Sequence, residues 1–534
     1  MATKGKVDAI VIGGGHNGLV TAGYLAKAGL KVTVLERRPI MGGACVTEEI
    51  APGFRISRTS YVCSLLLPEV VRDFRLKEYG FRVYIPDPTY FCPYPDGRYL
   101  LLHDDAAKRR QEIAKFSAHD AEAYERMHEE LYRLQPLMED LLRTTPPKFP
   151  PEGLSDYWAY MKLGRKFKAL ERKDLKLFIE LMTASCAEYL GRRLESTEIK
   201  AMAAAGGIIG TCVGVMTPGS AYVLVHHAVG GVDGQAGAWG YVYGGMGGIA
   251  DALCRSVQDL GVEIRTEAGV AKVLVHNGRA QGVVLENGDE LRSRIVASSA
   301  DPKHTYLKLV DSEHLGDEFV EDIRKFKIQG SSIKVNLALG ELPNWTCLPG
   351  TDPKAPQHQA MIEISPSMEY LERAFDDLKY GRPSQRPFID ANIASVVDDS
   401  LAPEGKHVMS CFVQYGPYHL KEGTWPEIRE KVGDIVVDTL AEYAPNLKSA
   451  IIARDVLTPW DLEQQYGLTE GNIFHGEITP DQLFFLRPAP GWADYRSPVR
   501  GLYLCGSGAH PGGGVMGGPG MNASREILRD LRGR

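Results

Sequence analysis

The segment DAIVIGGGHNGLVTAGYLAKAGLKVTVLE, residues 8–36, constrains the fold more than any other part of the chain. Residues 6–12 contain an apolar run typical of a buried parallel strand, and residues 31–35 form a second one. Between them, residues 19–28 have a helical pattern that ends at a glycine. Three glycines in GxGxxG register join the first strand to this helix: Gly13, Gly15 and Gly18. The pattern predicts a βαβ unit with a glycine-rich first turn.

Each glycine of this turn has a separate task in a dinucleotide-binding unit. Gly13 permits the tight turn, Gly15 lets the backbone approach a pyrophosphate, and Gly18 allows helix and strand to pack closely. The helix N-terminus adds N–H groups and partial positive charge for the phosphates. We expect Asn17 among the cofactor contacts, whereas His16 is expected to turn its side chain aside.

A carboxylate and a glycine doublet after the second strand indicate which dinucleotide fits. Glu36 ends that strand, where a carboxylate accepts hydrogen bonds from ribose hydroxyls and repels a 2′-phosphate. The doublet Gly42–Gly43 follows. Together with GxGxxG, this arrangement resembles the flavoproteins that bind FAD in an extended conformation. The resemblance implies that the doublet closes over the pyrophosphate and that neighbouring residues also contact the cofactor, namely Arg37, Arg38 and Ala44.

A second glycine-rich segment lies near the C-terminus, in GLYLCGSGAHPGGGVMGGPGMNASREIL, residues 501–528. Residues 501–505 form a short apolar strand, and residues 521–531 have a helical pattern. Eight of the fifteen residues from 506 to 520 are glycine, which costs backbone entropy and indicates close approach to a large planar ligand. We expect the flavin ring to lie here, facing the N-terminus of the following helix. The expected contacts are Gly506, Ser507, Met516 and Gly517.

The middle of the chain indicates that the nucleotide domain is interrupted. Residues 249–260 have a helical pattern, residues 263–265 form a strand, and the turns HNGR and ENGD predict a three-stranded excursion. In FAD proteins of this class such a segment rejoins the nucleotide domain, which places Val270 near the adenine. We therefore predict an α/β fold, with a Rossmann-like FAD-binding domain and an inserted mixed α+β substrate domain. The FAD-binding domain comprises residues 1–85, 236–310 and 481–534, and the substrate domain comprises residues 86–235 and 311–480.

Further motifs extend the resemblance over nearly the whole chain: GGGHNGL at 13–19, AWGYVYGGMGG at 238–248 and GLTEGNIFHGEITPDQLFFLRP at 467–488. Together with the C-terminal glycines, these motifs resemble those of the phytoene desaturase-type flavoproteins, a group that also includes carotenoid isomerases and retinol saturase. The resemblance implies a FAD-dependent oxidoreductase. No strand in the right frame precedes GGMGG, so a second site for NAD(P)H is not predicted. A disulfide reductase is excluded, because Ile50 stands where the partner of Cys45 would have to be.

Composition and charge limit the partners. The net charge of −7 disfavours nucleic acid, which requires a basic surface. The nine cysteines are scattered without a CxxC pair, and no metal-ligand spacing appears, so we expect no metal and a reducing compartment. The N-terminal residues lack a signal-peptide pattern, which predicts a cytoplasmic protein of open oligomeric state. Residues 201–232 carry no charge, but seven glycines and Pro218 indicate a buried layer or cavity wall rather than a membrane span.

The inserted domain carries a basic and aromatic segment after the proline cluster at 144–153. This segment, YWAYMKLGRKFKALERKDLK at 157–176, has seven basic residues against two acidic ones between Lys162 and Lys176. One interpretation is contact with an anionic membrane surface, useful for a protein that extracts an apolar substrate. The other, which we favour, is a solvated basic helix that packs through Tyr157, Trp158 and Phe167.

The sequence constrains the reaction less than it constrains the cofactor. Hydride transfer to a flavin requires a positioned substrate and, in some reactions, a base. The candidate catalytic residues are His510, His475 and Tyr61, with a structural role as the competing interpretation of His475. The leading hypothesis is a FAD-dependent desaturase or dehydrogenase of a hydrophobic, isoprenoid-like or polyene-like molecule, with oxygen or a quinone as electron acceptor. The alternatives are a FAD oxidase of small polar compounds such as amines, and a flavin-binding regulatory protein without turnover.

Overall fold

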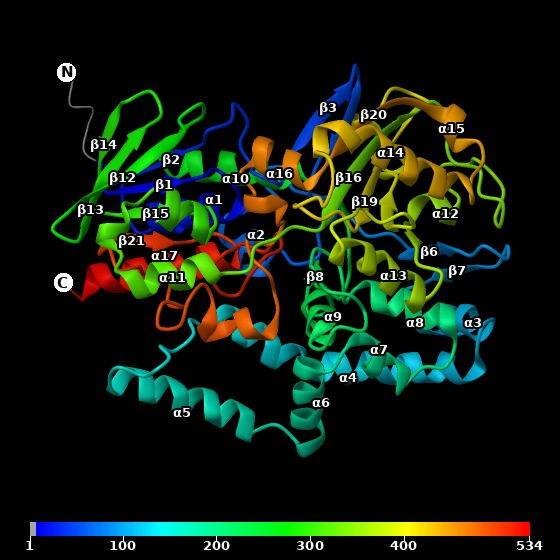
Figure 1. Cartoon of the computed structure of the whole chain (residues 1–534), viewed down its shortest axis with the longest axis horizontal. Coiled ribbons are helices and arrows are strands. Elements are labelled where there is room, and N and C mark those ends of the chain that lie inside the picture. The colour runs from blue at the N-terminus through cyan, green and yellow to red at the C-terminus, as the bar shows by residue number, and fades with distance from the viewer. Residues whose placement is uncertain (1–6, 534) are drawn as a thin grey trace.

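Two sheets organise the computed structural model, which describes residues 7–533 (Figure 1). The first sheet is parallel, with the strand order β11-β2-β1-β15-β21. Its strands are β1 (Ala9–Ile12), β2 (Val32–Leu35), β11 (Glu263–Arg265), β15 (Val296–Ser298) and β21 (Leu502–Leu504). All except β11 are fully buried, which explains their largely apolar composition. Lys6, within the first predicted strand, lies outside the described residues.

Helix α1 (His16–Lys27) packs on β1 and β2 and against α10 (Gly247–Asp259) and α17 (Gly518–Arg532). The predicted βαβ unit and α/β fold class are thereby confirmed. α1 begins three residues before its apolar pattern, directly after Gly15. Gly520 brings α17 close to α1, since a Cβ there would lie 2.3 Å from the Asn17 carbonyl oxygen. The Thr21 hydroxyl donates to the carbonyls of Asn17 and Gly520 across the same contact.

An antiparallel excursion follows β11, as the two predicted turns require. It consists of β12 (Val270–His276), β13 (Arg279–Leu285) and β14 (Glu290–Arg292). Helix α11 (Asp317–Lys325) buries Phe319, Val320 and Ile323 in the same core as the parallel strands. Because this apolar face is buried there, the core of the nucleotide region continues beyond the predicted boundary at residue 310.

The second sheet has the strand order β20-β16-β19-β18-β17-β6-β7 and is antiparallel except between β17 and β6. Its strands are β6 (Tyr90–Pro93), β7 (Tyr99–Leu102), β16 (Ser332–Leu339), β17 (Met361–Ile364), β18 (Phe388–Asn392), β19 (His407–Gln414) and β20 (Ile451–Leu457). Helices α13 (Met368–Lys379) and α14 (Trp425–Ala441) pack beside it. The hairpin β3 (Thr47–Ala51) and β4 (Phe54–Ser57) packs on this sheet through Phe54 and Ile56, so the N-terminal segment bridges both regions.

A helical layer lies along the lower side of the molecule in Figure 1, with α5 at the lower left and most of the other helices below the second sheet. It contains α3 (Ala106–Ala114), α4 (Ala118–Arg143), α5 (Leu154–Lys168), α6 (Arg172–Thr183), α7 (Cys186–Gly191), α8 (Thr197–Ala205) and α9 (Ser220–Ala228). The uncharged stretch 201–232 is largely buried in α8, α9 and their connection, as a packing layer requires. Among the described residues, no helix is long and apolar enough to cross a bilayer. Short elements complete the chain: α2 (Pro68–Asp73), α12 (Pro356–Gln359), α15 (Leu447–Ala450), α16 (Pro459–Tyr466), β5 (Val83–Tyr84), β8 (Gly231–Val232), β9 (Gln235–Ala236) and β10 (Tyr241–Val242).

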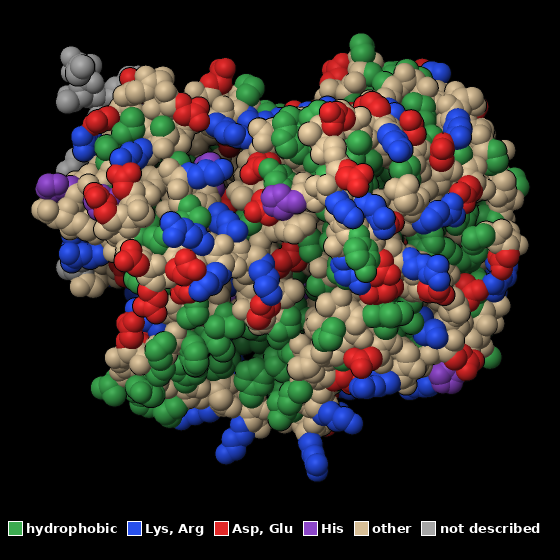
Figure 2. Space-filling model, viewed as in Figure 1, with side chains coloured by type: hydrophobic (Ala, Val, Ile, Leu, Met, Phe, Trp, Pro, Cys, Tyr) green, Lys and Arg blue, Asp and Glu red, His purple; other side chains and the backbone are tan. Residues whose placement is uncertain are grey.

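Helix α5 departs from the expectation for its segment, because it has no buried residue. Tyr157 and Trp158 are each 57% exposed, so they do not provide the expected packing. Phe167 does pack, with its ring edge-on to Phe178 at 5.2 Å. Figure 2 shows hydrophobic side chains gathered over the lower left of the molecule, where α5 lies in Figure 1.

The contact between α1 and α17 leads to a stability prediction. Gly520→Ala places a methyl group against the Asn17 carbonyl, so the two helices must separate, and we expect a loss of about 1–3 kcal/mol in the free energy of unfolding. The control is Gly164→Ala in α5, where a Cβ meets no atom within 4 Å and helix propensity improves. Denaturant unfolding of both variants tests the contact, and equal midpoints would contradict it.

Candidate functional site

A cavity of about 490 Å³ lies where the carboxyl ends of β1, β2 and β15 approach the second sheet. It extends from Glu36 and Val270 in the nucleotide region to Lys334 on β16 and Phe412 on β19. Open α/β sheets bind ligands in this position, beyond the carboxyl ends of their strands. The cavity therefore joins the predicted cofactor turn to the inserted region.

The first turn of α1 forms one wall of this cavity. α1 begins directly after Gly15, and no side chain caps it, so its first N–H groups are available to an anion. The Gly42 N–H donates to the Gly14 carbonyl at 2.9 Å, which brings the glycine doublet against this turn. A Cβ at Gly15 would find its nearest neighbour 3.9 Å away, so the space beside it is open. Open space, donors and close glycines suit a pyrophosphate.

The Glu36 carboxylate holds this turn against the end of β2. It accepts hydrogen bonds from the backbone N–H groups of Gly14 at 2.8 Å and Arg38 at 2.9 Å. The Glu36 carbonyl accepts from the Ala268 N–H at 2.8 Å, which brings Val270 to the same end of the cavity. The side chain is 7% exposed and lines the cavity, as a carboxylate that binds a ribose must.

The C-terminal glycine-rich loop contacts the first turn directly, although 490 positions separate Asn17 from Ser507. The Asn17 amide donates to the Ser507 hydroxyl at 3.1 Å. The His16 ring hydrogen-bonds the Gly514 carbonyl at 3.2 Å, and burial lowers the pKa of His16 to about 4. The expectation that His16 turns aside is wrong, because its neutral ring lines the cavity and ties the two loops together.

Arg487 holds the C-terminal loop from behind. Its buried guanidinium donates at 2.8–3.2 Å to four backbone carbonyls, those of Phe474, Gly476, Glu477 and Ser507. Burial lowers the pKa of Arg487 to about 10, so it remains protonated at neutral pH. The 474–477 turn is thereby fixed to Ser507, and His475 is held at the cavity wall.

Two buried polar atoms at this wall have no hydrogen-bond partner among the residues that the structure describes, Asn17 Oδ1 and His475 Nδ1. Buried polar atoms are normally paired. Both atoms lie beside the uncapped helix and the contact between the glycine loops, where a dinucleotide offers hydroxyls, amides and ring nitrogens. The residues present therefore fit FAD.

Most of the predicted site residues lie together. Those that line the cavity are Gly13, Gly15, Asn17, Glu36, Arg37, Gly42, Gly43, Ala44, Tyr61, Val270, His475 and Ser507. Six others do not line it: Gly18, Arg38, Gly506, His510, Met516 and Gly517. Gly18 and Gly506 instead permit close backbone packing, since a Cβ at either would lie 2.2 Å from a carbonyl oxygen. Arg38 stacks on Tyr466, with 4.5 Å from its guanidinium carbon to the ring centroid.

Three predicted residues of the C-terminal glycine loop turn away from the cavity: His510, Met516 and Gly517. His510 hydrogen-bonds the Leu141 carbonyl at 2.9 Å and packs near Phe484, so it fixes α4 rather than facing the cofactor. Met516 lines a second cavity, and Gly517 is the left-handed residue before α17. The sequence could not separate these residues from Ser507 and Gly514, because glycine content alone does not show which way a loop turns.

The far end of the cavity contains a buried ionisable cluster around Tyr61. The Tyr61 hydroxyl donates to Asp390 Oδ2 at 2.6 Å, and its ring stacks on Phe412 with centroids 5.6 Å apart. The Lys334 ammonium nitrogen lies 4.6 Å from the Tyr61 ring centroid and donates to the Ser410 hydroxyl at 2.5 Å. Burial raises the pKa of Asp390 to about 7 and lowers the pKa of Lys334 to about 7.

Lys334 is the functional candidate that the sequence interpretation missed. It is 2% exposed on a strand that is buried throughout, and it lines the cavity. A signal was present, because Lys334 is the one charged residue in the run SSIKVNLAL, residues 331–339. A lysine in a strand that is buried on both faces is rarely there for stability.

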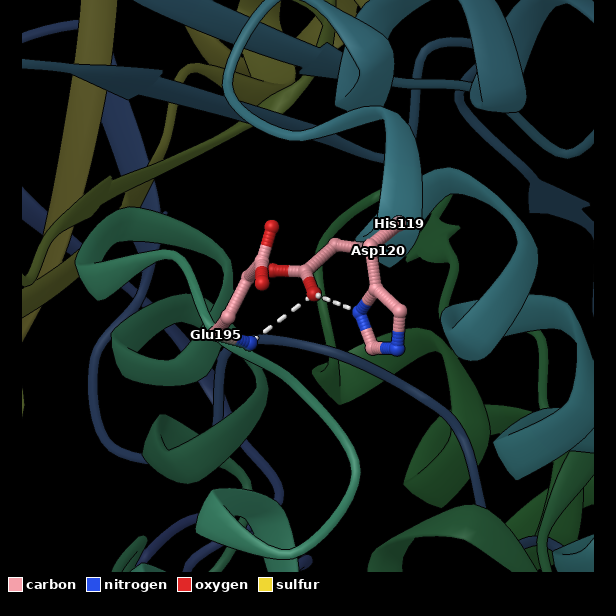
Figure 3. A group of neighbouring side chains, drawn as sticks. All are labelled: His119, Asp120 and Glu195. Carbon is pink, nitrogen blue, oxygen red and sulfur yellow. Dashed lines mark hydrogen bonds and ion pairs between the residues drawn. The ribbon is translucent and has the colours of Figure 1, made fainter.

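A cluster of His119, Asp120 and Glu195 has the composition of a metal site but a structural explanation (Figure 3). Asp120 accepts from the N–H groups of Glu195 and Ser196, the Ser196 hydroxyl and the His119 ring, at 2.6–3.0 Å. Its carboxylate therefore joins the start of α4 to the residues before α8.

The comparisons with known proteins agree with this geometry. The family described as "Flavin containing amine oxidoreductase" matches residues 18–527. The chain belongs to this family. FAD is the cofactor, and the chain is a flavin-dependent oxidoreductase.

The relatives confirm the resemblance to the phytoene desaturase type. The "Pyridine nucleotide-disulfide oxidoreductase domain-containing protein 2" of Mus musculus is 44% identical, over 99% of this chain and 94% of its own. The "Phytoene desaturase (neurosporene-forming)" of Cereibacter sphaeroides is 25% identical, over 98% and 94%. Cyclohexylamine oxidase from Brevibacterium oxydans shares the fold, with a TM-score of 0.58 at 16% identity over 99% and 100% of the chains.

Glu36 provides a test of the cofactor site. Glu36→Gln retains the size of the side chain but removes the charge that strengthens its hydrogen bonds, so we expect FAD to bind at least about tenfold more weakly. Titration of the apoprotein with FAD measures the change. Glu49→Gln is the control, because Glu49 also accepts a backbone N–H, from Gly53 at 2.9 Å, but is exposed outside the cavity. Equal affinities in the two variants would contradict the assignment.

Lys334 leads to a prediction about pH. Its pKa is about 7 in the folded chain against 10.5 without burial, so between these values the unfolded chain binds more protons and stability rises with pH. Lys334→Met should abolish this rise, measured by denaturant unfolding at several pH values. The control is Lys354→Met at an exposed position, which should keep the rise. Parallel curves for Lys334→Met and the unaltered chain would contradict the assignment.

Proposed function

We propose that the protein dehydrogenates a largely apolar substrate held at the far end of the FAD cavity. The observation that carries this proposal is the composition of that end. Its wall includes Leu65, Ile209, Trp239, Phe412 and Phe474. Apolar and aromatic walls with a few polar groups are typical of sites for small hydrophobic ligands.

The distribution of charge favours a neutral substrate over an amine. Among the described residues, the carboxylates that line the cavity are Glu36 and Glu286. Both lie at the nucleotide end, since Glu286 packs against Gly269 beside Val270. At the far end the face of Tyr61, which could attract a cationic amine, is already covered by Lys334. Asp390 accepts the Tyr61 hydroxyl and does not line the cavity, so an amine bound there would have no carboxylate on the cavity surface and would lie near the Lys334 ammonium group.

The polar groups at this end suit proton handling around an otherwise apolar reaction. Burial lowers the pKa of His227, which packs beside Trp239, so its ring is neutral and can accept a proton. Lys334 and Asp390 have pKa values near 7, where a proton moves at little cost. Bound FAD would supply the hydride acceptor, with oxygen or a quinone receiving its electrons. The phytoene desaturase relative supports an isoprenoid hydrocarbon as the substrate class.

Anaerobic reduction of the FAD-loaded protein tests the proposal. We expect polyene or prenyl hydrocarbons to bleach the flavin absorbance and amines to leave it unchanged. Bleaching by amines alone would favour the oxidase alternative, and no bleaching by either class would favour a flavin-binding protein without turnover.

A matched pair of variants locates the reaction in the cavity. Ile209→Asn puts an amide into the apolar wall, and we expect the rate of bleaching to fall at least about tenfold with FAD content unchanged. Ile452→Asn makes the same change on β20, where the side chain is 52% exposed, and should leave the rate unaltered. Equal rates in both variants would place the substrate elsewhere.

A further inference from the structure

Helix α5 lacks the packing that normally stabilises a helix of its length. It spans fifteen residues, none of which is buried. Helices of globular proteins gain most of their stability from an apolar stripe packed against a core, and an isolated helix of this length is marginal in water. Its attachments are few: the Tyr160 hydroxyl donates to the Lys148 carbonyl at 3.0 Å, and Lys166 pairs with Asp140.

The outward face of α5 is an ordered stripe. Four large apolar side chains lie at spacings i, i+3, i+4 and i+7, and all are about half exposed or more: Leu154, Tyr157, Trp158 and Met161. Arg165 and Lys168, at i+11 and i+14, continue the same face. Leu163 and Phe167 lie on the opposite side and are partly buried. The helix therefore presents an apolar half followed by a basic half.

Helix α6 continues this surface. Its inner side buries Asp174, Leu177 and Leu181. Its outer side carries Arg172, Leu175, Lys176 and Ile179, again at i, i+3, i+4 and i+7, with Ile179 54% exposed. Within the described residues, Lys162, Arg165, Lys168, Arg172 and Lys176 form no ion pair with an acidic side chain of the chain. Figure 2 shows Lys and Arg side chains projecting from the lower edge of the molecule, beside the hydrophobic patch.

We propose that the surface formed by the outer faces of α5 and α6 docks on an anionic lipid bilayer. Tyr and Trp prefer the interface between headgroups and acyl chains, and the unpaired basic side chains are complementary to anionic headgroups. A second copy of the chain fits less well, because a two-fold contact would place this positive surface against itself. The proposed contact is with the surface of the bilayer. Among the described residues, no helix is long and apolar enough to span it.

Docking explains how an apolar molecule could reach the protein from a membrane. The docking surface consists of α5 and α6, neither of which lines the FAD cavity, so lipid binding can be measured independently of turnover.

The test is cosedimentation of the FAD-loaded full chain with vesicles. We expect binding to vesicles of phosphatidylcholine mixed with phosphatidylglycerol, weaker binding to phosphatidylcholine alone, and loss of the difference at high ionic strength. Trp158→Glu combined with Met161→Glu should lower binding at least about tenfold, with FAD content and melting temperature unchanged. Tyr380→Glu, at a position 66% exposed beyond α13, is the matched control and should bind like the unaltered chain.

Arg165→Glu combined with Lys168→Glu separates the electrostatic contribution to binding from the contribution of the apolar side chains. It should reduce binding to the anionic vesicles and leave the weaker binding to phosphatidylcholine in place. The proposal is overturned if no vesicle binds the unaltered chain, or if the Trp158 and Met161 variant binds as well as the Tyr380 control. It is also overturned if light scattering shows that the unaltered chain is a dimer and that the Trp158 and Met161 variant is a monomer. The surface would then be covered by a second copy of the chain.

Discussion

The hydrogen bond from the Asn17 amide to the Ser507 hydroxyl is the contact on which the site depends. It joins the first turn of the chain to the loop after its last strand, and the His16 ring repeats the connection at Gly514. Neither loop could close a binding site alone, because each contributes a single wall. The long insertions between them can therefore form a separate sheet and helical layer. Both walls still follow strands of one parallel sheet, β1 and β21, which flank β15.

Polar groups at the two ends of the cavity meet different physical demands. At the nucleotide end, Glu36 is buried, and each of its two carboxylate oxygens accepts a backbone N–H where ribose hydroxyls are expected. At the far end, Tyr61, Asp390 and Lys334 have few partners and are almost fully removed from water. Burial brings the pKa values of Asp390 and Lys334 together near 7, an arrangement more typical of a functional site than of a stabilising ion pair.

The sequence predicted those features of the fold and of the site that depend on residues close together in the chain. The βαβ unit, the three-stranded excursion and the cavity position of Glu36 and Gly42 were predictable, because turn glycines and strand-end acids act within a few residues. The direction of the C-terminal loop was not predictable. His510 turns away from the FAD cavity and hydrogen-bonds the Leu141 carbonyl, and Met516 lines the second cavity. Lys334 was not identified, because its role can be inferred only from its neighbours Tyr61 and Asp390, which are distant from it in the sequence. Trp158 was misplaced because amphipathic spacing does not show whether anything covers the apolar face.

We expect the two glycine-rich loops, at opposite ends of the chain, to close over one FAD molecule. A crystal structure of the FAD-bound protein would show this. The pyrophosphate should lie against Gly15 at the start of α1, and the same molecule should reach Ser507 and Gly514. A FAD molecule in contact with only one of the two loops, or bound outside this cavity, would show that the loops do not form one site.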